Sequence, residues 1–130
     1  MEIVRCWQEQ GITIQEPYRR CIRVFLAPDR RRVPEITFSH AIIYPGSKTD
    51  YHVHDRPELI QILSGRGICI CDGEKTDIGP DMALWVRKGE KHQVINDGEE
   101  TIKLATVFVP AYTAEESYQR CQEAAAGGAK

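Results

Sequence analysis

The stretch at residues 46–65, GSKTDYHVHDRPELIQILSG, constrains the fold of this chain more than any other segment. His52 and His54 are two positions apart, and on a strand such side chains point to the same face. Residues 55–57 end in a proline, which lacks a backbone N–H and disfavours helix at the residue before it, so we expect a bend between two strands. That bend brings Glu58 toward the histidines, and two imidazoles with one carboxylate suit a divalent first-row transition metal.

A fourth ligand is then expected from another part of the chain. Only two further histidines are present, His40 and His92. His40 lies in an apolar, β-branched segment at residues 36–44, and His92 opens a short segment at residues 92–95. At this point both histidines remain candidates.

Short segments rich in β-branched and aromatic residues run along most of the chain, separated by glycine, proline, asparagine and aspartate. This pattern predicts an all-β sandwich or barrel. Asp72-Gly73 predicts a hairpin turn, and the turn at residues 65–67 is expected to make the next strand the hairpin partner of the one before it. The expected strands are residues 12–16, 20–27, 36–44, 58–63, 68–71, 75–78, 82–86, 92–95 and 101–109, with a further candidate at 2–8 and a histidine strand around 52–54.

The C-terminal segment has a different character. Thr113 is followed three residues later by Glu116, which is a capping-box pattern, and residues 114–125 then predict a helix that Gly127-Gly128 ends. No repeat, linker or low-complexity stretch divides the 130 residues, so we expect one domain over residues 1–130.

Composition excludes some classes of partner. The net charge of −2 gives no indication of binding to nucleic acid or to an anionic membrane. The charge is uneven, because residues 1–34 carry seven arginines and four acidic residues, whereas the rest carries 10 basic and 15 acidic residues. The arginines at 30–32 suit a solvated loop, or alternatively an anion-attracting rim or a subunit contact. We find no apolar run long enough to span a bilayer and no basic-then-apolar leader, so we expect a cytoplasmic protein.

The five cysteines have no disulfide-scaffold spacing, so we expect free thiols in a reducing cytosol. The close spacing of Cys69 and Cys71 is compatible with a metal-binding pair. They alternate with isoleucines in an expected strand, however, and no second cysteine pair is present. We therefore expect them to pack as small apolar residues.

The residues above give the chain a clear resemblance to the cupin superfamily, in its small single-domain form. The first cupin motif places a glycine, His-x-His, a glutamate and a second glycine at fixed offsets, and residues 46–65 keep every spacing. The second motif spans residues 81–96, where Gly89, His92 and Asn96 fit. Asp81 and Arg87 depart from it, since the family pattern has glycine and proline there.

The resemblance implies a double-stranded β-helix (jelly-roll) barrel, and it selects His92 over His40 as the remaining ligand. One divalent ion (Mn, Fe, Ni, Co or Zn) would be held by His52, His54, Glu58 and His92. This set leaves one or two coordination positions open on a six-coordinate ion, as metal catalysis needs. His40 is then expected to be a strand residue or to support a ligand.

The alternation of side chains along each strand predicts which residues form the wall of the pocket. If the ligands point inward, Ile60, Ile62 and Val94 do as well, which gives an apolar tube with the metal near one mouth. No acid or base outside the ligand set is marked, so Tyr51 and Tyr44 are the candidate catalytic residues. Arg23 and Thr106 are further polar candidates for the wall.

Two functions of different classes follow from the resemblance. The first is a metal-dependent enzyme of dioxygenase, isomerase, lyase or decarboxylase type that acts on a small polar, carboxylate-bearing or sugar-like molecule. The alternative is a non-catalytic cupin module that binds a small ligand or a metal, which an entirely apolar pocket wall would favour. A storage-type barrel ranks last, because an intact ligand set has no role there. The resemblance also implies a homodimer that pairs through outer strands.

Overall fold

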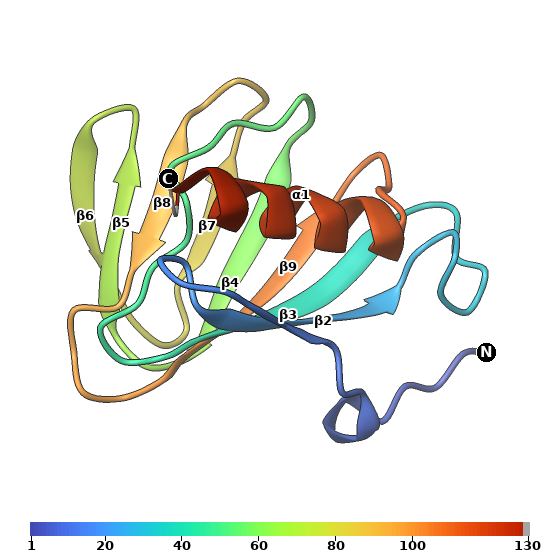
Figure 1. The fold of residues 1–130 in the computed structure, drawn as a ribbon. Helices are drawn as coiled ribbons and strands as arrows, with labels where there is room; N and C mark the ends of the chain where they lie inside the picture. The colour runs from blue at the N-terminus through green and yellow to red at the C-terminus, as the bar shows by residue number, and fades with distance from the viewer. Residues whose placement is uncertain (129–130) are drawn as a thin grey trace.

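The structure is a computed structural model, and it describes residues 1–128. Within these residues the chain forms nine strands, one short 3-10 turn and one α-helix (Figure 1). The bounds are η1 (Cys6–Gln8), β1 (Ile12–Ile14), β2 (Arg20–Leu26), β3 (Thr37–Ile43), β4 (Glu58–Ser64), β5 (Gly67–Cys71), β6 (Glu74–Ile78), β7 (Ala83–Val86), β8 (His92–Ile95), β9 (Ile102–Phe108) and α1 (Ala114–Gly128).

The strands form two antiparallel sheets that face each other. The larger sheet has the order β1-β2-β3-β9-β4-β7, and the smaller has the order β6-β5-β8. A buried apolar cluster joins their inner faces, because Ile60, Ile62 and Leu104 of the larger sheet pack with Ile78 and Val94 from the strands of the smaller one. The predicted all-β jelly-roll barrel with a C-terminal helix is therefore confirmed.

The turn between β4 and β5 differs from the expectation. The strand at 67–71 does not pair with β4; it pairs with β6 on one side and β8 on the other. Gly65 has a φ of +83°, and an added Cβ would lie 2.4 Å from the Thr101 carbonyl oxygen. The chain thus makes a tight left-handed turn there and passes from one sheet to the other. The Asp72-Gly73 hairpin is present as expected, joining β5 and β6.

Two further segments differ from the expectation. Residues 2–8 contain the turn η1 and no strand. The helix reaches Gly128, so Gly127 lies inside it and does not end it at 125. One glycine costs a helix only about 1 kcal/mol relative to alanine, and the preceding run of alanines favours helix.

Helix α1 closes the part of the inner face that the smaller sheet leaves uncovered. Figure 1 shows it lying across the strands of the larger sheet, beside β8. Its buried side packs on β1 and β2, in a second apolar cluster made by Ile14, Ile22, Val24, Ala27, Ala114, Cys121 and Ala125.

The start of α1 is held in two ways. The predicted capping box forms, since the Glu116 N–H donates to the Thr113 hydroxyl and the Thr113 N–H donates to the Glu116 carboxylate, both at 3.0 Å. In addition, the Asp29 carboxylate accepts from the N–H groups of Ala114 at 2.6 Å and Glu115 at 3.2 Å. A loop far away in the sequence therefore fixes where the helix begins. No helix within the described residues is long and apolar enough to cross a membrane.

Candidate metal centre

His52 and His54 lie in an extended loop between β3 and β4 rather than in the expected strand. A single bridge joins His52 to His92, the first residue of β8, through backbone hydrogen bonds of 3.0 and 2.8 Å. The Gly89 N–H donates to the His54 carbonyl at 3.1 Å and fixes the loop a second time. Because extended backbone keeps the alternation of a strand, both imidazoles still point inward.

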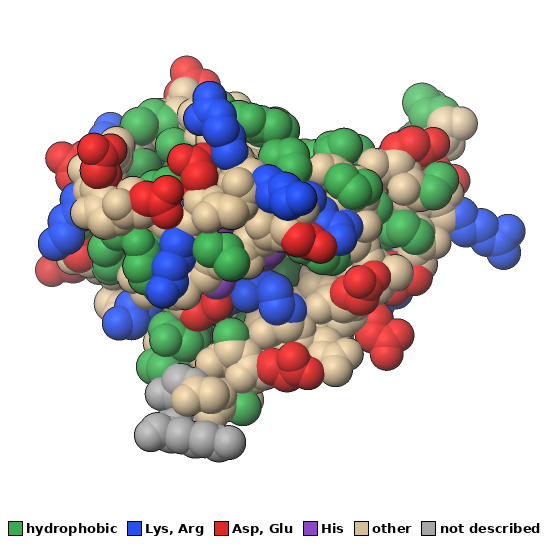
Figure 2. Space-filling model, turned by 90° about the horizontal axis from the view of Figure 1, so that it is seen from above, with side chains coloured by type: hydrophobic (Ala, Val, Ile, Leu, Met, Phe, Trp, Pro, Cys, Tyr) green, Lys and Arg blue, Asp and Glu red, His purple; other side chains and the backbone are tan. Residues whose placement is uncertain are grey.

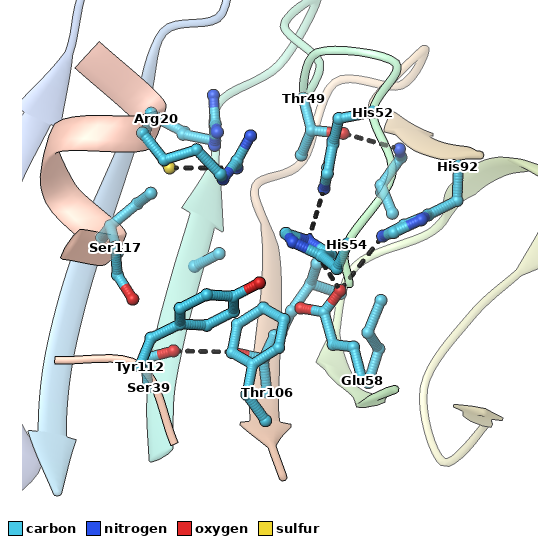
Figure 3. Close-up of a pocket in the computed structure, with 18 of the residues that line it drawn as sticks. Arg20, Ser39, Thr49, His52, His54, Glu58, His92, Thr106, Tyr112 and Ser117 are labelled. Carbon is cyan, nitrogen blue, oxygen red and sulfur yellow. Dashed lines mark hydrogen bonds and ion pairs between the residues drawn. The ribbon is translucent and has the colours of Figure 1, made fainter. Parts of the chain in front are cut away.

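The structure brings the four predicted ligands together. One ligand atom from each of His52, His54, Glu58 and His92 lies within 4.8 Å of every other. His52 Nε2 and His54 Nε2 are 2.9 Å apart, and His92 Nε2 is 3.0 Å from Glu58 Oε1 (Figure 3). His54 Nε2 lies 3.6 Å from the same carboxylate oxygen. Glu58 opens β4 and His92 opens β8, so both sheets contribute.

Backbone carbonyls orient two of the imidazoles. Nδ1 of His52 lies 2.7 Å from the Asp50 carbonyl oxygen, and Nδ1 of His92 lies 3.0 Å from the Glu90 carbonyl oxygen. A carbonyl can only accept, so each Nδ1 carries a proton, which directs each Nε2 toward the centre and leaves it as the atom available to a metal. This is how proteins orient metal-binding histidines.

Electrostatics keep two of the imidazoles neutral. Burial lowers the pKa of His52 to about 3, and the nearby Arg120 guanidinium adds to the effect. Burial and the neighbouring His52 lower the pKa of His54 well below its usual value as well. Within the described residues Nδ1 of His54 is buried and has no hydrogen-bond partner, so no contact fixes the tautomer of His54, and its Nε2 lies 2.9 Å from that of His52, where both can present lone pairs to one cation. The donor set therefore fits a divalent metal ion, which binds neutral imidazole.

His92 is different, because it faces a carboxylate. Burial alone would lower its pKa, but the hydrogen bond and the charge of Glu58 outweigh this and raise it. The buried thiol of Cys69 is not part of the cluster, and burial raises its pKa to about 11. Nitrogen and oxygen donors without thiolate suit a catalytic transition metal better than a closed structural zinc site.

The four residues line one side of a cavity of about 250 Å³. Seen from above, histidine surface lies recessed in a hollow whose rim carries basic and acidic side chains (Figure 2). Side chains of the barrel interior form the middle of the cavity, among them a buried hydroxyl pair in which Ser39 and Thr106 are 2.6 Å apart. Tyr112 and residues of α1 form the opposite side.

Side-chain parity predicted part of this wall. Ile60, Val94 and Thr106 line the cavity as expected, whereas Ile62 packs in the apolar core. Arg23 lies outside the cavity, where it donates to the Cys6 carbonyl oxygen at 2.9 Å and lies 3.2 Å from His40 Nδ1. His40 is thus a buried strand residue, separate from the ligand cluster.

Neither predicted catalytic tyrosine lines the cavity. The Tyr51 hydroxyl accepts from the Gly73 N–H at 3.1 Å, in the β5–β6 hairpin turn. The Arg19 guanidinium lies 4.6 Å from the centre of the Tyr44 ring. The tyrosine of the cavity is Tyr112, whose ring centre lies 6.0 Å from that of His54 and whose hydroxyl donates to Asp55 at 2.7 Å.

The sequence interpretation missed Arg20, Ser117 and Arg120 as well as Tyr112. Arg20 could have been found, since it shares parity with the apolar Ile22 and the two lie on the inner face of β2. The residues of α1 carried no comparable signal, because nothing in the helix pattern states which part of the barrel the helix covers.

These observations define a class of protein: a small jelly-roll barrel whose pocket gathers three histidines and a glutamate around one centre. A sequence profile of the cupin domain matches residues 39–109, more than half of the chain. The chain belongs to the cupin family, as the motif at residues 46–65 predicted.

Individual relatives include synthases and a decarboxylase-like protein. An L-ectoine synthase from Bordetella avium is 28% identical over 96 residues, covering 72% of this chain and 70% of that protein. The crystal structure of ectoine synthase from P. lautus gives a TM-score of 0.77 at 19% identity, over 92% of this chain and 86% of that one. The crystal structure of a predicted oxalate decarboxylase from Thermotoga maritima gives a TM-score of 0.77 at 20% identity, over 84% of this chain and 99% of that one. At these identities the two structures establish the fold alone.

Proposed function

We propose that this protein is a metal-dependent enzyme that holds one divalent transition-metal ion through His52, His54, Glu58 and His92. The observation that carries the proposal is the convergence of these four ligand atoms within 4.8 Å at the side of a cavity. Two of the imidazoles are already oriented by backbone carbonyls, so the site needs little rearrangement to bind an ion.

The bound ion would supply Lewis-acid chemistry, which polarises an oxygen of the substrate. Residues of the chain bind and orient the substrate and exclude water, since helix α1 and the barrel enclose the cavity. Burial and the hydrogen bond to Asp55 raise the pKa of Tyr112, so its hydroxyl stays protonated at neutral pH. Tyr112 therefore takes the place of Tyr44 and Tyr51 as the candidate proton donor.

The reaction is proposed to be of the lyase or decarboxylase type on a small polar molecule. A relative whose name states ectoine synthesis, 28% identical over 96 residues, supports this choice. The non-catalytic alternative called for an apolar wall. The hydroxyls of Ser39, Thr106, Tyr112 and Ser117 make the wall partly polar, which supports the enzyme.

The first test is metal analysis of protein purified without added metal. We expect about one transition-metal ion per chain, lost in Glu58→Ala and retained in Glu74→Ala, which changes an exposed glutamate of β6. Full occupancy in Glu58→Ala would refute the site. An oxygen electrode with the metal-loaded protein and candidate substrates then tests the reaction class, because O₂ consumption would show a dioxygenase.

We also propose that residues 1–130 act as one cytoplasmic domain that forms a homodimer. Leu59 and Trp85, which are register partners on β4 and β7, are exposed together with Leu63. An arginine-rich N-terminal third and an acidic remainder give two copies complementary charge. Solution scattering at micromolar concentration should give twice the mass of the chain, and Trp85→Lys should halve it. A monomer mass for the unaltered protein would refute the dimer.

A further inference from the structure

A buried cluster of charges lies beside the metal ligands, and its Asp50 carboxylate is 3.4 Å from Nδ1 of His52. The Asp50 carboxylate lies between two arginines, with Arg20 Nη2 at 3.4 Å from one oxygen and Arg120 Nη1 at 3.2 Å from the other. The side chain of Arg20 is 3% exposed and that of Asp50 is 11% exposed. Both arginines line the cavity, and Figure 3 shows Arg20 on the opposite side from His92.

The charges of this triad, which consists of Arg20, Asp50 and Arg120, do not balance. Two guanidinium groups and one carboxylate leave a net charge of +1 in a largely buried place, and an unbalanced buried charge is costly. The Asp50 carboxylate is shared, so neither arginine has a carboxylate of its own. Arg120 retains 34% of its side chain exposed while it lines the cavity. Its guanidinium has five N–H donors, more than the contacts with Asp50 and Cys121 use.

An unpaired polar group lies near Arg120 on the same helix. The hydroxyl oxygen of Ser117, one turn earlier on α1, is buried and has no hydrogen-bond partner among the described residues. It lines the same cavity, across from His92 (Figure 3). A buried hydroxyl without a partner is unfavourable, and a bound ligand oxygen would supply one. A guanidinium and a hydroxyl side by side are suited to bind a carboxylate.

The size of the cavity limits the ligand. A volume of about 250 Å³ lies just below the range of roughly 300–1,000 Å³ that is typical of sites for drug-sized ligands, so the cavity suits a smaller molecule. The apolar side chains that line the cavity, including Ile60 and Leu104, suit a short carbon chain.

We propose that Arg120 and Ser117 of helix α1, supported by Arg20, bind the carboxylate of a short-chain substrate whose other end carries the oxygen that reaches the metal centre. The inference rests on the proposed function for the role of the metal, but its carboxylate site uses none of the four ligands. Arg120 is then a specificity-determining residue, and the C-terminal helix selects the substrate.

Isothermal titration tests this with matched pairs of ligands. The probes are straight-chain carboxylates of three to six carbons that carry a hydroxyl or keto oxygen, each compared with its uncharged primary amide. The unaltered protein should prefer at least one acid over its amide by about tenfold to hundredfold, as expected for a charge-assisted hydrogen bond. Arg120→Gln should remove this preference, Arg120→Lys should keep part of it, and Ser117→Ala should weaken it severalfold.

The control is Arg31→Gln. Arg31 has a similar exposure of 31% and pairs with Glu9 outside the cavity, so this variant should keep the full preference. Loss of folding would show in circular dichroism, and Ser117→Ala then carries the test. An unchanged acid-over-amide preference in folded Arg120→Gln, or no preference in the unaltered protein, would overturn the inference.

Metal affinity is measured in the same proteins by competition with a chromophoric chelator. Arg120→Gln should still bind about one metal ion per chain, with an affinity equal to or above that of the unaltered protein, because the four ligands are kept and the guanidinium charge near His52 is removed. If no metal binds at all, the proposed function fails, while the acid-over-amide preference of the metal-free protein still decides the carboxylate site.

Discussion

Metal binding should stabilise the fold, and the size of the effect can be worked out. A ligand that binds only the native state adds RT ln(1 + [L]/Kd), which is about 2.7 kcal/mol at a free metal concentration of one hundred times Kd. The entropy of unfolding for 130 residues is about 0.27 kcal/mol per kelvin, at about 2.1 cal/mol per kelvin per residue. The unfolding temperature should therefore rise by about 10 °C.

Removing one ligand should remove most of this shift. In His52→Ala the Nε2 atom that lies 2.9 Å from His54 Nε2 is gone. If the metal affinity falls about 100-fold, the same metal concentration equals the new Kd and adds only about 0.4 kcal/mol, or about 1.5 °C.

The assay is a thermal melt with Mn²⁺, Co²⁺, Ni²⁺, Zn²⁺ and anaerobic Fe²⁺, each against the same protein in chelator. His40→Gln is the matched control, because His40 is a buried histidine of β3 outside the ligand cluster, and it should keep the full shift. An equal shift in His52→Ala and the unaltered protein, or loss of the shift in His40→Gln alone, would contradict the assignment of ligands.

Three further predictions concern stability. Burial, with Lys103 and Arg23 nearby, lowers the pKa of His40 to about 4. In the unfolded chain this histidine has a pKa near 6.5 and takes up its proton first as the pH falls. The free energy of unfolding should therefore decrease by about 1–3 kcal/mol between pH 6.5 and 4. Urea titrations of His40→Gln should show a smaller decrease than those of the unaltered protein. Asp29→Ala removes the acceptor for two N–H groups of α1 and should cost about 1–2 kcal/mol in the same assay; an unchanged urea midpoint would contradict that role. Ile62→Ala leaves a cavity at a side chain that is 1% exposed and should cost about 2–5 kcal/mol, whereas a loss below about 1 kcal/mol would place Ile62 outside the core.

Sequence reasoning worked where the information is local. Residues 46–65 carry three of the candidate ligands at fixed offsets around a bend, so the spacing alone predicts that these side chains converge. Even the departure at Asp81 is explained locally, since this residue has a φ of +71°, the conformation for which the family motif uses glycine. The capping box at Thr113 and Glu116 is a four-residue pattern and forms as predicted.

The errors lie where tertiary contacts decide. A glycine turn after residue 64 has the same appearance whether the chain returns to its own sheet or passes to the other one, so the pairing of β5 could not be predicted. Likewise, the 114–125 pattern predicts a helix but not what it covers, because the anchoring Asp29 is 85 residues away from Ala114. Arg120 and Tyr112 were therefore missed as residues of the cavity, whereas Tyr44 and Tyr51, the catalytic candidates from the sequence, do not line it.

The place of α1 at the end of the described chain has a consequence for how the pocket can change by mutation. The four candidate metal ligands all precede residue 93, whereas Ser117 and Arg120 come from the final element of the described chain. The four candidate metal ligands and the helical part of the proposed carboxylate site thus lie in separate stretches of the sequence, although the supporting Arg20 precedes both. Under the two proposals above, substitutions confined to α1 would change which molecule the cavity accepts and leave the four candidate metal ligands unaltered.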